Sequence, residues 1–194
     1  MSSSYFITQL ATVYDGSTVP VLVDGDTVIW ESLAIIEYLA ERFPDLNIWP
    51  KQHDARAMAR AISAEMHAGF SALRSACPMN LGKRFATRDR GDDCASDVSR
   101  VCSLWQRARE AFGKKTDHRY LFGQFCAADA MYAPVVTRLD TYYIEVPEDV
   151  RGYMNAILGS EAFLDWRNSA LSEPWIFDED EIDEVPIKDL RSTG

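Results

Sequence analysis

The sequence predicts an α/β segment followed by an all-α domain, and three observations support this fold class. Two short β-branched runs flank an Asp-Gly turn within residues 19–30. From Ser32 onward, apolar residues recur every three or four positions, which is the period of an amphipathic helix. Prolines and glycines divide the rest of the chain into several such stretches. With 194 residues, 47% of them hydrophobic, the chain can bury a core without metals or disulfides.

Residues 19–30 have the pattern of a β-hairpin. The run V-P-V-L-V stands before D-G-D, and T-V-I-W follows. An Asp-Gly pair between β-branched runs is a strong signal for a hairpin turn. The first eighteen residues fit two structures, because their composition is strand-like while Phe6, Leu10 and Val13 also share one face of a helix. We favour a helix there.

The period changes to that of a helix at Ser32. Apolar residues keep this spacing up to Phe43, and Pro44 ends the run. Residues 45–52 contain Pro50 and show no periodicity, so they are expected to link two domains. The predicted divisions are residues 1–44, residues 52–177 and an acidic tail over residues 178–194.

The second half is predicted to be helical. Asp54 is the expected N-cap of a long helix that reaches Cys77 and stops at Pro78. Residues 83–93 are charged and contain glycine, so a loop is expected there. Pro134 is expected to kink a later helix. Apolar periodicity places the remaining helices over residues 98–112, 127–142, 147–158 and 161–171.

The charge balance argues against two classes of partner. The formal net charge is -10, and an acidic surface repels nucleic-acid phosphates and anionic membrane lipids. Six of the seven residues 178–184 are acidic. Because this run lacks any His or Cys ligand pattern, a solvated tail is expected there, and no metal site is predicted.

The cysteines indicate a reducing compartment. No two of them form a C-x-x-C pair, and no signal peptide stands ahead of them. No apolar run approaches the length that spans a membrane. We therefore expect a cytoplasmic protein with four free thiols, at Cys77, Cys94, Cys102 and Cys126.

A ligand-binding pattern lies where the hairpin meets the helix. Glu31 and Ser32 stand at the predicted helix start, where unpaired N–H groups and the helix dipole favour a carboxylate. The Ser32 hydroxyl adds a donor. Val19 and Pro20 open the first strand. If their peptide bond is cis, the Val19 backbone can face outward and pair with an extended peptide.

This stretch resembles the glutathione-binding signature of the soluble glutathione S-transferases, in which V-P precedes a hairpin and E-S opens the third helix. The resemblance implies that the Val19 backbone holds the cysteinyl part of glutathione and that Pro20 is cis. It also implies that Glu31 and Ser32 hold the γ-glutamyl carboxylate. Glutathione would then be the cosubstrate.

The resemblance extends into the helical half. F-G-Q-F-C-A-A-D-A at residues 122–130 matches the family, although Cys126 stands where the family usually has a Ser or Thr N-cap. Asp129 is expected to stabilise this helix start. Two further motifs resemble those of bacterial members near the maleylacetoacetate isomerase, or zeta-like, branch. They are A-E-M-H at residues 64–67 and A-D-A-M-Y-A-P at residues 128–134.

The family's first domain is thioredoxin-like and begins with a strand, a helix and a strand. A βαβ unit needs about 30 residues, whereas 18 residues precede Val19. We therefore expect a partial thioredoxin-like N-terminal domain, followed by an all-helical glutathione transferase C-terminal domain. The family's thiol-activating Ser, Tyr or Cys belongs to the opening part, so no catalytic residue is assigned.

Several other side chains have ordinary explanations. His67 could line a cleft for a second substrate, but a packed or solvent-facing histidine is favoured. Cys126 could have a lowered pKa near a helix start, but a buried structural role is favoured. Four aromatic residues are expected in the core and not in a substrate pocket: Trp105, Tyr132, Tyr142 and Tyr143.

Three functions are weighed. The first is a homodimeric transferase that, in a full-length form, conjugates glutathione to a small electrophile or isomerises a glutathione adduct. The second is a non-catalytic ligand-binding or protein-interaction module of the same fold. The third is a helical dimerisation module with a vestigial hairpin.

Overall fold

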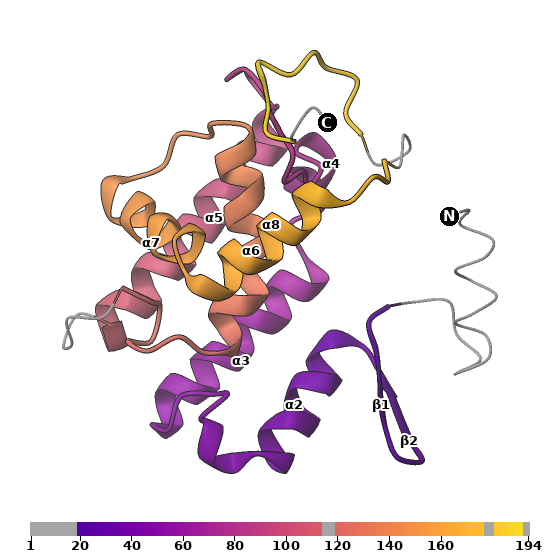
Figure 1. Cartoon of the computed structure of the whole chain (residues 1–194). Helices are drawn as coiled ribbons and strands as arrows, with labels where there is room; N and C mark the ends of the chain where they lie inside the picture. The colour runs from indigo at the N-terminus through magenta and orange to yellow at the C-terminus, as the bar shows by residue number, and fades with distance from the viewer. Residues whose placement is uncertain (1–18, 114–118, 177–180, 192–194) are drawn as a thin grey trace. The chain divides into compact units, whose positions relative to one another are not determined.

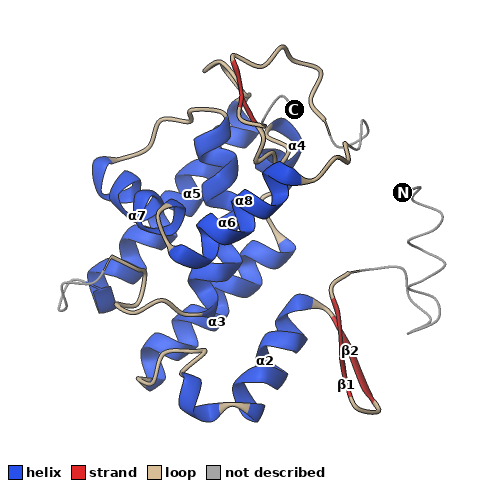
Figure 2. Cartoon of the chain, viewed as in Figure 1, coloured by secondary structure: helices blue, strands red, loops and turns tan. Residues whose placement is uncertain are grey.

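The computed structural model describes residues 19–113, 119–176 and 181–191, and it divides into two compact units, Met1–Trp49 and Pro50–Gly194. Figure 1 labels strands β1 and β2 and helices α2 to α8. Figure 2 shows that the described strands are confined to one hairpin in the first unit and one short pair in the second. The helix expected over the first eighteen residues lies outside the described residues.

The first unit contains a hairpin and a helix. β1 (Val21–Asp24) and β2 (Thr27–Trp30) pair antiparallel around a two-residue turn, as predicted. Gly25 in this turn has φ +59°, a conformation that glycine adopts without steric cost. α2 (Ser32–Arg42) follows, and the 3-10 turn η1 (Pro44–Leu46) succeeds it where proline cannot continue an α-helix.

The second unit is a helical bundle in which α3 contacts both α5 and α6, and α7 contacts α5, α6 and α8. The π-helical turn η2 (Arg109–Gly113) extends α5. No helix in the described part of the chain is long and apolar enough to cross a bilayer. The principal helices are α3 (His53–Ala68), α5 (Asp92–Ala108), α6 (Ala127–Thr141), α7 (Glu148–Leu158) and α8 (Glu161–Ser172).

Aromatic side chains join the bundle helices. The Trp105 ring on α5 meets Tyr132 of α6 at 5.3 Å and Tyr153 of α7 at 4.8 Å between ring centroids, edge to face in both cases. All three side chains are buried. The Tyr132 hydroxyl donates to the carbonyl oxygen of Ile62 on α3 at 3.0 Å. This cluster confirms the predicted core role of Trp105 and Tyr132. Tyr142 is buried as well, but the prediction is wrong for Tyr143, which is 44% exposed just beyond the end of α6.

The start of α6 is held by Asp129, as predicted. Its carboxylate accepts the backbone N–H of Cys126 at 2.9 Å and that of Leu121 at 3.2 Å. The two bonds satisfy the N–H of the N-cap residue Cys126 and that of Leu121 in the preceding loop. Burial nevertheless raises the pKa of Asp129.

The predicted N-cap of α3 is wrong by two residues. The helix begins at His53, and Gln52, with an extended backbone, occupies the N-cap position. Asp54 instead lies in the first turn. Its negative charge still interacts favourably with the positive end of the helix dipole there.

The predicted single helix up to Cys77 is also wrong. α3 ends at Ala68, and a separate helix, α4 (Ser71–Ala76), follows. A Cβ on Gly69 would lie 2.7 Å from the carbonyl oxygen of Glu65, so only glycine fits this turn. Phe70 then takes φ +60°, which reorients the chain. Apolar periodicity continues across the break, which explains why the pattern indicated one helix.

The expected loop over residues 83–93 contains a strand. β3 (Lys83–Arg84) pairs antiparallel with β4 (Lys188–Asp189), and α5 already begins at Asp92.

The prediction of a solvated acidic tail is wrong for residues 181–191. Its Glu181 and Glu184 form ion pairs with Lys83 and Arg90, because basic side chains face the acidic run.

Candidate functional site

The register of the hairpin brings the two predicted binding dipeptides together. Val21 of β1 faces Trp30 of β2. This is the last pair of the ladder, so V-P directly precedes it on one side and E-S directly follows it on the other. The resulting corner, at the end of the hairpin away from its turn, has four members: Val19, Pro20, Glu31 and Ser32.

The Val19 side of the corner is open. The peptide bond between Val19 and Pro20 is cis, which confirms the prediction. Val19 is 57% exposed, and within the described hairpin the ladder begins only at Val21. An exposed residue just outside the ladder is a candidate for pairing with an extended peptide, in the manner of strand addition.

Glu31 turns the chain from β2 into α2 through an unusual backbone conformation. Its φ is +70° and its ψ is 118°, a region that costs a residue with a Cβ about 1–3 kcal/mol. The Glu31 carbonyl accepts the Ile35 N–H at 3.0 Å, which begins the helix. Such strain occurs preferentially at ligand clamps, so it supports a binding role for the corner.

The N-terminus of α2 is suited to an anion. Ser32 is the first helical residue, and no side chain caps the helix. The first-turn N–H groups and the helix dipole therefore remain available to a carboxylate, and the Ser32 hydroxyl lies beside them. Positive φ at Glu31, an uncapped helix start and an open strand end thus coincide at one place.

A contact that the sequence analysis missed holds α2 against the hairpin. The Tyr38 hydroxyl donates to Oδ2 of Asp24 at 2.7 Å, and Nε of Arg42 lies 3.9 Å from the same oxygen. The hydrogen bond to the Asp24 carboxylate raises the pKa of Tyr38. Tyr38 and Arg42 are four residues apart and therefore lie on one helix face. This spacing could have predicted that both contact the same partner.

The other predicted candidates lie in the second unit and show no activated group. Cys126 is buried, and burial raises its pKa. Burial likewise raises the pKa of Tyr132 and takes that of Cys77 to about 12. His67 is exposed on α3. Among the described thiols and phenols, every pKa shift is upward, which keeps these groups protonated. The described residues also contain no His, Cys, Asp or Glu cluster suited to a metal ion.

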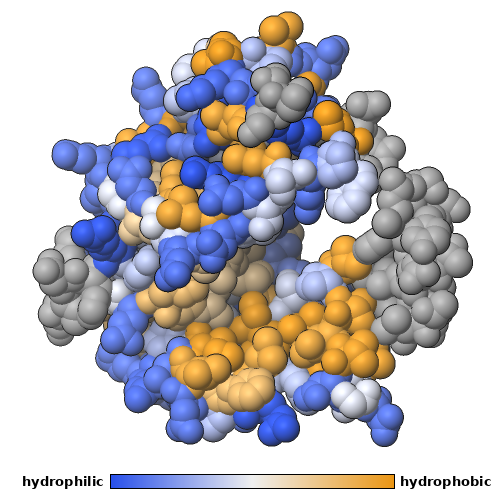
Figure 3. All heavy atoms as spheres, viewed as in Figure 1, coloured by the Kyte–Doolittle hydropathy of each residue, from blue (hydrophilic) through white to orange (hydrophobic). Residues whose placement is uncertain are grey.

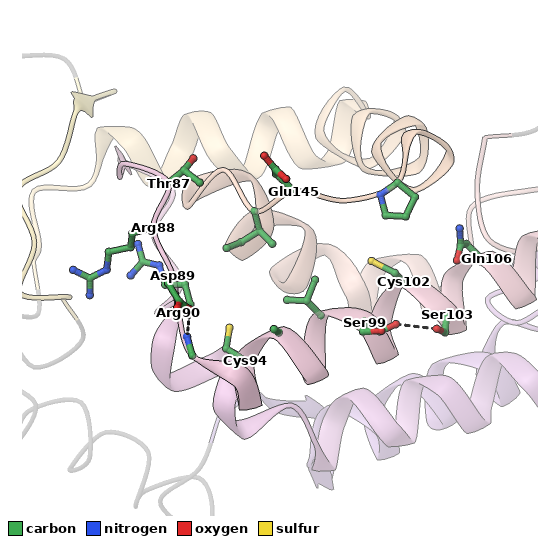
Figure 4. A pocket seen from close by; sticks show the side chains of 15 residues that line it. Thr87, Arg88, Asp89, Arg90, Cys94, Ser99, Cys102, Ser103, Gln106 and Glu145 are labelled. Atoms are coloured by element: carbon green, nitrogen blue, oxygen red, sulfur yellow. Dashed lines mark hydrogen bonds between the residues drawn. The ribbon is translucent and has the colours of Figure 1, made fainter.

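A cavity of about 550 Å³ lies within the second unit (Figure 4), between α5, residues 87–91 and residues 144–147. Arg88 and Asp89 stand at one end in Figure 4, and Cys94 and Cys102 stand along α5. Burial raises the pKa of both thiols. The cavity can hold a small molecule, but its cysteines are not activated nucleophiles.

Comparisons with known proteins concern both units. Residues 4–47, which include the whole corner, match the family model "Glutathione S-transferase, N-terminal domain". A probable maleylacetoacetate isomerase of Caenorhabditis elegans is 43% identical over 67 residues, which is 34% of this chain and 31% of that protein. The chain thus spans about a third of that relative's length.

Two longer matches reach the helical unit. A stringent starvation protein A homologue of Coxiella burnetii is 27% identical over 151 residues, covering 76% of this chain and 67% of that protein. A solved glutathione transferase homologue from Burkholderia, with bound glutathione, superposes with a TM-score of 0.60 at 22% identity, covering 81% of this chain and 75% of that one. The superposition shows a shared fold.

Proposed function

We propose that the chain is a glutathione S-transferase-family protein near the maleylacetoacetate isomerase branch, and that its hairpin corner binds glutathione. One observation carries the proposal. The β1–β2 ladder ends at Val21 and Trp30, so V-P and E-S flank the same end of the hairpin, and the described residues give the adjoining start of α2 no side-chain cap. Glutathione is an extended peptide with carboxylate ends, and the corner offers an open strand end and an anion site.

Each part of the corner receives one part of the ligand. The γ-glutamyl carboxylate accepts from the Ser32 hydroxyl and from the first N–H groups of α2. The backbone of Val19 pairs with the cysteinyl part. Glu31 shapes the turn that presents these donors. Tyr38, through Asp24, keeps α2 in register with the hairpin.

In a full-length form, we propose, glutathione is the cosubstrate of a transfer to a small electrophile or of an isomerisation of a glutathione adduct. A free thiol has a pKa of about 8.5, so catalysis needs a group that stabilises the thiolate. Burial raises the pKa of Cys77, Cys126 and Tyr132, so these groups do not act as activated donors or nucleophiles. We therefore expect the 194-residue chain to bind glutathione weakly and to react near the uncatalysed rate.

A second candidate is a non-catalytic ligand-binding or protein-interaction module of this family. The upward pKa shifts of the described thiols favour it over an active enzyme. Turnover of a chloronitrobenzene by the 194-residue chain, well above the rate in buffer, would exclude this alternative. Retention on immobilised glutathione separates both candidates from a helical dimerisation module with a vestigial hairpin.

Two further properties follow from family membership as proposals. We propose a homodimer, because closed two-fold dimers are the commonest oligomers, and a cytoplasmic location, because the four thiols are free. Light scattering across micromolar concentrations tests the first. A strictly monomeric chain throughout that range would contradict it.

Titration calorimetry with glutathione tests the binding proposal. Replacing Ser32 by alanine removes a hydroxyl donor to a carboxylate, a bond worth about 1.5–3 kcal/mol, so affinity should fall about tenfold or more. Ser75→Ala is the matched control, because Ser75 is exposed on α4 of the other unit. Equal affinities of Ser32→Ala and the unaltered chain would show that the corner does not hold the carboxylate.

A further inference from the structure

Residues 181–191 lie along residues 80–90 of the second unit as an added strand. β4 pairs with β3, with Lys188 opposite Arg84 and Asp189 opposite Lys83. The N–H of Ile187 donates to the Arg84 carbonyl at 2.8 Å. The N–H of Leu190 donates to the Gly82 carbonyl at 2.7 Å. The backbone of residues 82–84 thus recognises an extended chain, as sheet edges do in strand addition.

The first glutamate of this segment occupies a polar site. Nζ of Lys83 lies 2.7 Å from Glu181 Oε2, and the Asn80 amide nitrogen lies 3.1 Å from both carboxylate oxygens. Asn80 is buried, and its Oδ1 accepts the N–H groups of Gly82 and Lys83. The amide is therefore fixed in the orientation that presents its donors to a carboxylate.

The second glutamate occupies a guanidinium site. Arg90 binds Glu184 in a bidentate manner, with N–O distances of 2.5 and 3.1 Å, and Arg88 contacts the same carboxylate at 2.8 Å. The Arg90 side chain is only 4% exposed, and its guanidinium lies 4.5 Å from the Tyr142 ring centre. A stacked, buried and bidentate arginine is a rigid carboxylate receptor.

The basic side chains of residues 80–90 contact Glu181 and Glu184 but not every acidic residue of the segment. Asp183 lies between them and is exposed. Arg84, although it belongs to β3, is paired with Asp140 of α6 at 2.7 Å instead of with the segment. The two sites therefore match glutamates three positions apart on a chain that continues as an extended strand.

Residues 181–191 are held with little apolar burial. Val185 is 89% exposed and Ile187 is 61% exposed, and no residue of the segment is buried. Carboxylate contacts and backbone hydrogen bonds therefore hold the segment in place. Another peptide that makes the same contacts can replace it, because no packed core has to be opened.

We propose that residues 80–90 form a docking surface for an acidic, extended segment of a partner protein with two glutamates three positions apart. In this arrangement residues 181–191 are an intramolecular competitor that keeps the surface closed. A tethered segment acts at an effective concentration of about millimolar. A partner must therefore bind tightly, or the ion pairs must be weakened by salt, before the surface opens. The proposal is independent of glutathione binding.

The test uses the full chain with Glu181→Gln and Glu184→Gln together. Loss of the two charge-assisted contacts should speed hydrogen exchange at the Ile187 and Leu190 amides about tenfold or more. Exchange in α6 should stay unchanged. Asp183→Asn is the matched control, because it removes one charge from the same segment at an exposed position.

The probe is a labelled synthetic peptide with the sequence of residues 181–191. Fluorescence anisotropy should show at least about tenfold tighter binding to the double variant than to the unaltered chain, which its own segment occupies. The same peptide carrying Glu181→Gln and Glu184→Gln should not bind.

Three results would overturn the proposal. Unchanged exchange at Ile187 and Leu190 would show that the carboxylates do not hold the segment. Faster exchange without peptide binding would show that the surface does not accept a peptide in trans. A dimer of the unaltered chain that exchanges residues 181–191 would make a second copy the occupant.

Discussion

The two units of the molecule differ in how their residues are packed. In the second unit, Trp105, Tyr132 and Tyr153 form a solvent-free cluster across three helices. In the first unit, no residue of β1, β2 or α2 is buried. Figure 3 shows hydrophobic residues gathered over α2 and the hairpin. Apolar side chains are present in β1, β2 and α2 as well as in the bundle, but only those of the bundle helices are fully buried.

This difference places stability and the candidate binding site in different units. The corner at Val19 and Ser32 depends on the hairpin ladder and on the Tyr38–Asp24 bond, rather than on a core. A site held by so few contacts is poorly preorganised, and poor preorganisation lowers affinity. The second unit has a rigid core but no activated thiol or phenol among its described residues.

The largest expected effect tests where stability resides. Trp105→Ala removes a buried ring from the centre of the second unit, and such truncations cost about 3–5 kcal/mol. Chemical denaturation followed by circular dichroism measures the loss. Trp166→Ala is the control, because Trp166 is 42% exposed on α8, and it should cost far less. Equal losses in the two variants would mean that the ring cluster is not the source of stability.

An effect of intermediate size compares the units directly. Elements with few buried contacts open at lower free energy than the global unfolding. We expect the amides of β1 and β2 to exchange about a hundredfold faster than those of α3 and α6. Hydrogen exchange read by NMR at neutral pH gives both sets at once. Equal protection of the hairpin and α3 would remove the distinction between the units.

The smallest expected effect concerns a surface ion pair of the second unit. Nε of Arg100 lies 2.6 Å from Oε1 of Glu65. The guanidinium holds the pKa of the Glu65 carboxyl below the ordinary 4.5. Its stabilisation is therefore present above pH 4.5 and is lost as the pH falls through the lowered pKa. Glu65→Gln should lower the melting temperature by at most about 3 °C at pH 7, because exposed pairs contribute little.

The pH dependence sharpens that measurement. In acid, where the carboxyl is protonated, the melting temperatures of Glu65→Gln and the unaltered chain should converge. Glu173→Gln is the control, since Glu173 is exposed beyond the end of α8. A loss at pH 7 as large as that of Trp105→Ala would assign the second unit's stability to surface charge instead of to its core.

Local patterns predicted the elements that local forces form. The Asp-Gly turn predicted the hairpin and the changed period at Ser32 predicted α2, whereas the cis bond at Val19–Pro20 was predicted from the family resemblance. The break between α3 and α4 was missed because apolar spacing continues through Gly69. It becomes visible only from the 2.7 Å approach of the Gly69 Cβ position to a backbone oxygen.

The sequence by itself predicted the two candidate binding dipeptides, the helical second half and the resemblance to the glutathione S-transferases, because these depend on neighbouring residues and on spacing along the chain. Tertiary structure decided what depends on distant residues. It tied Tyr38 to Asp24, joined Trp105 to Tyr153, and laid Glu184 against Arg90, 94 positions away. Acidity alone indicated a solvated tail, because composition records charge but not the basic surface that a folded chain brings opposite to it.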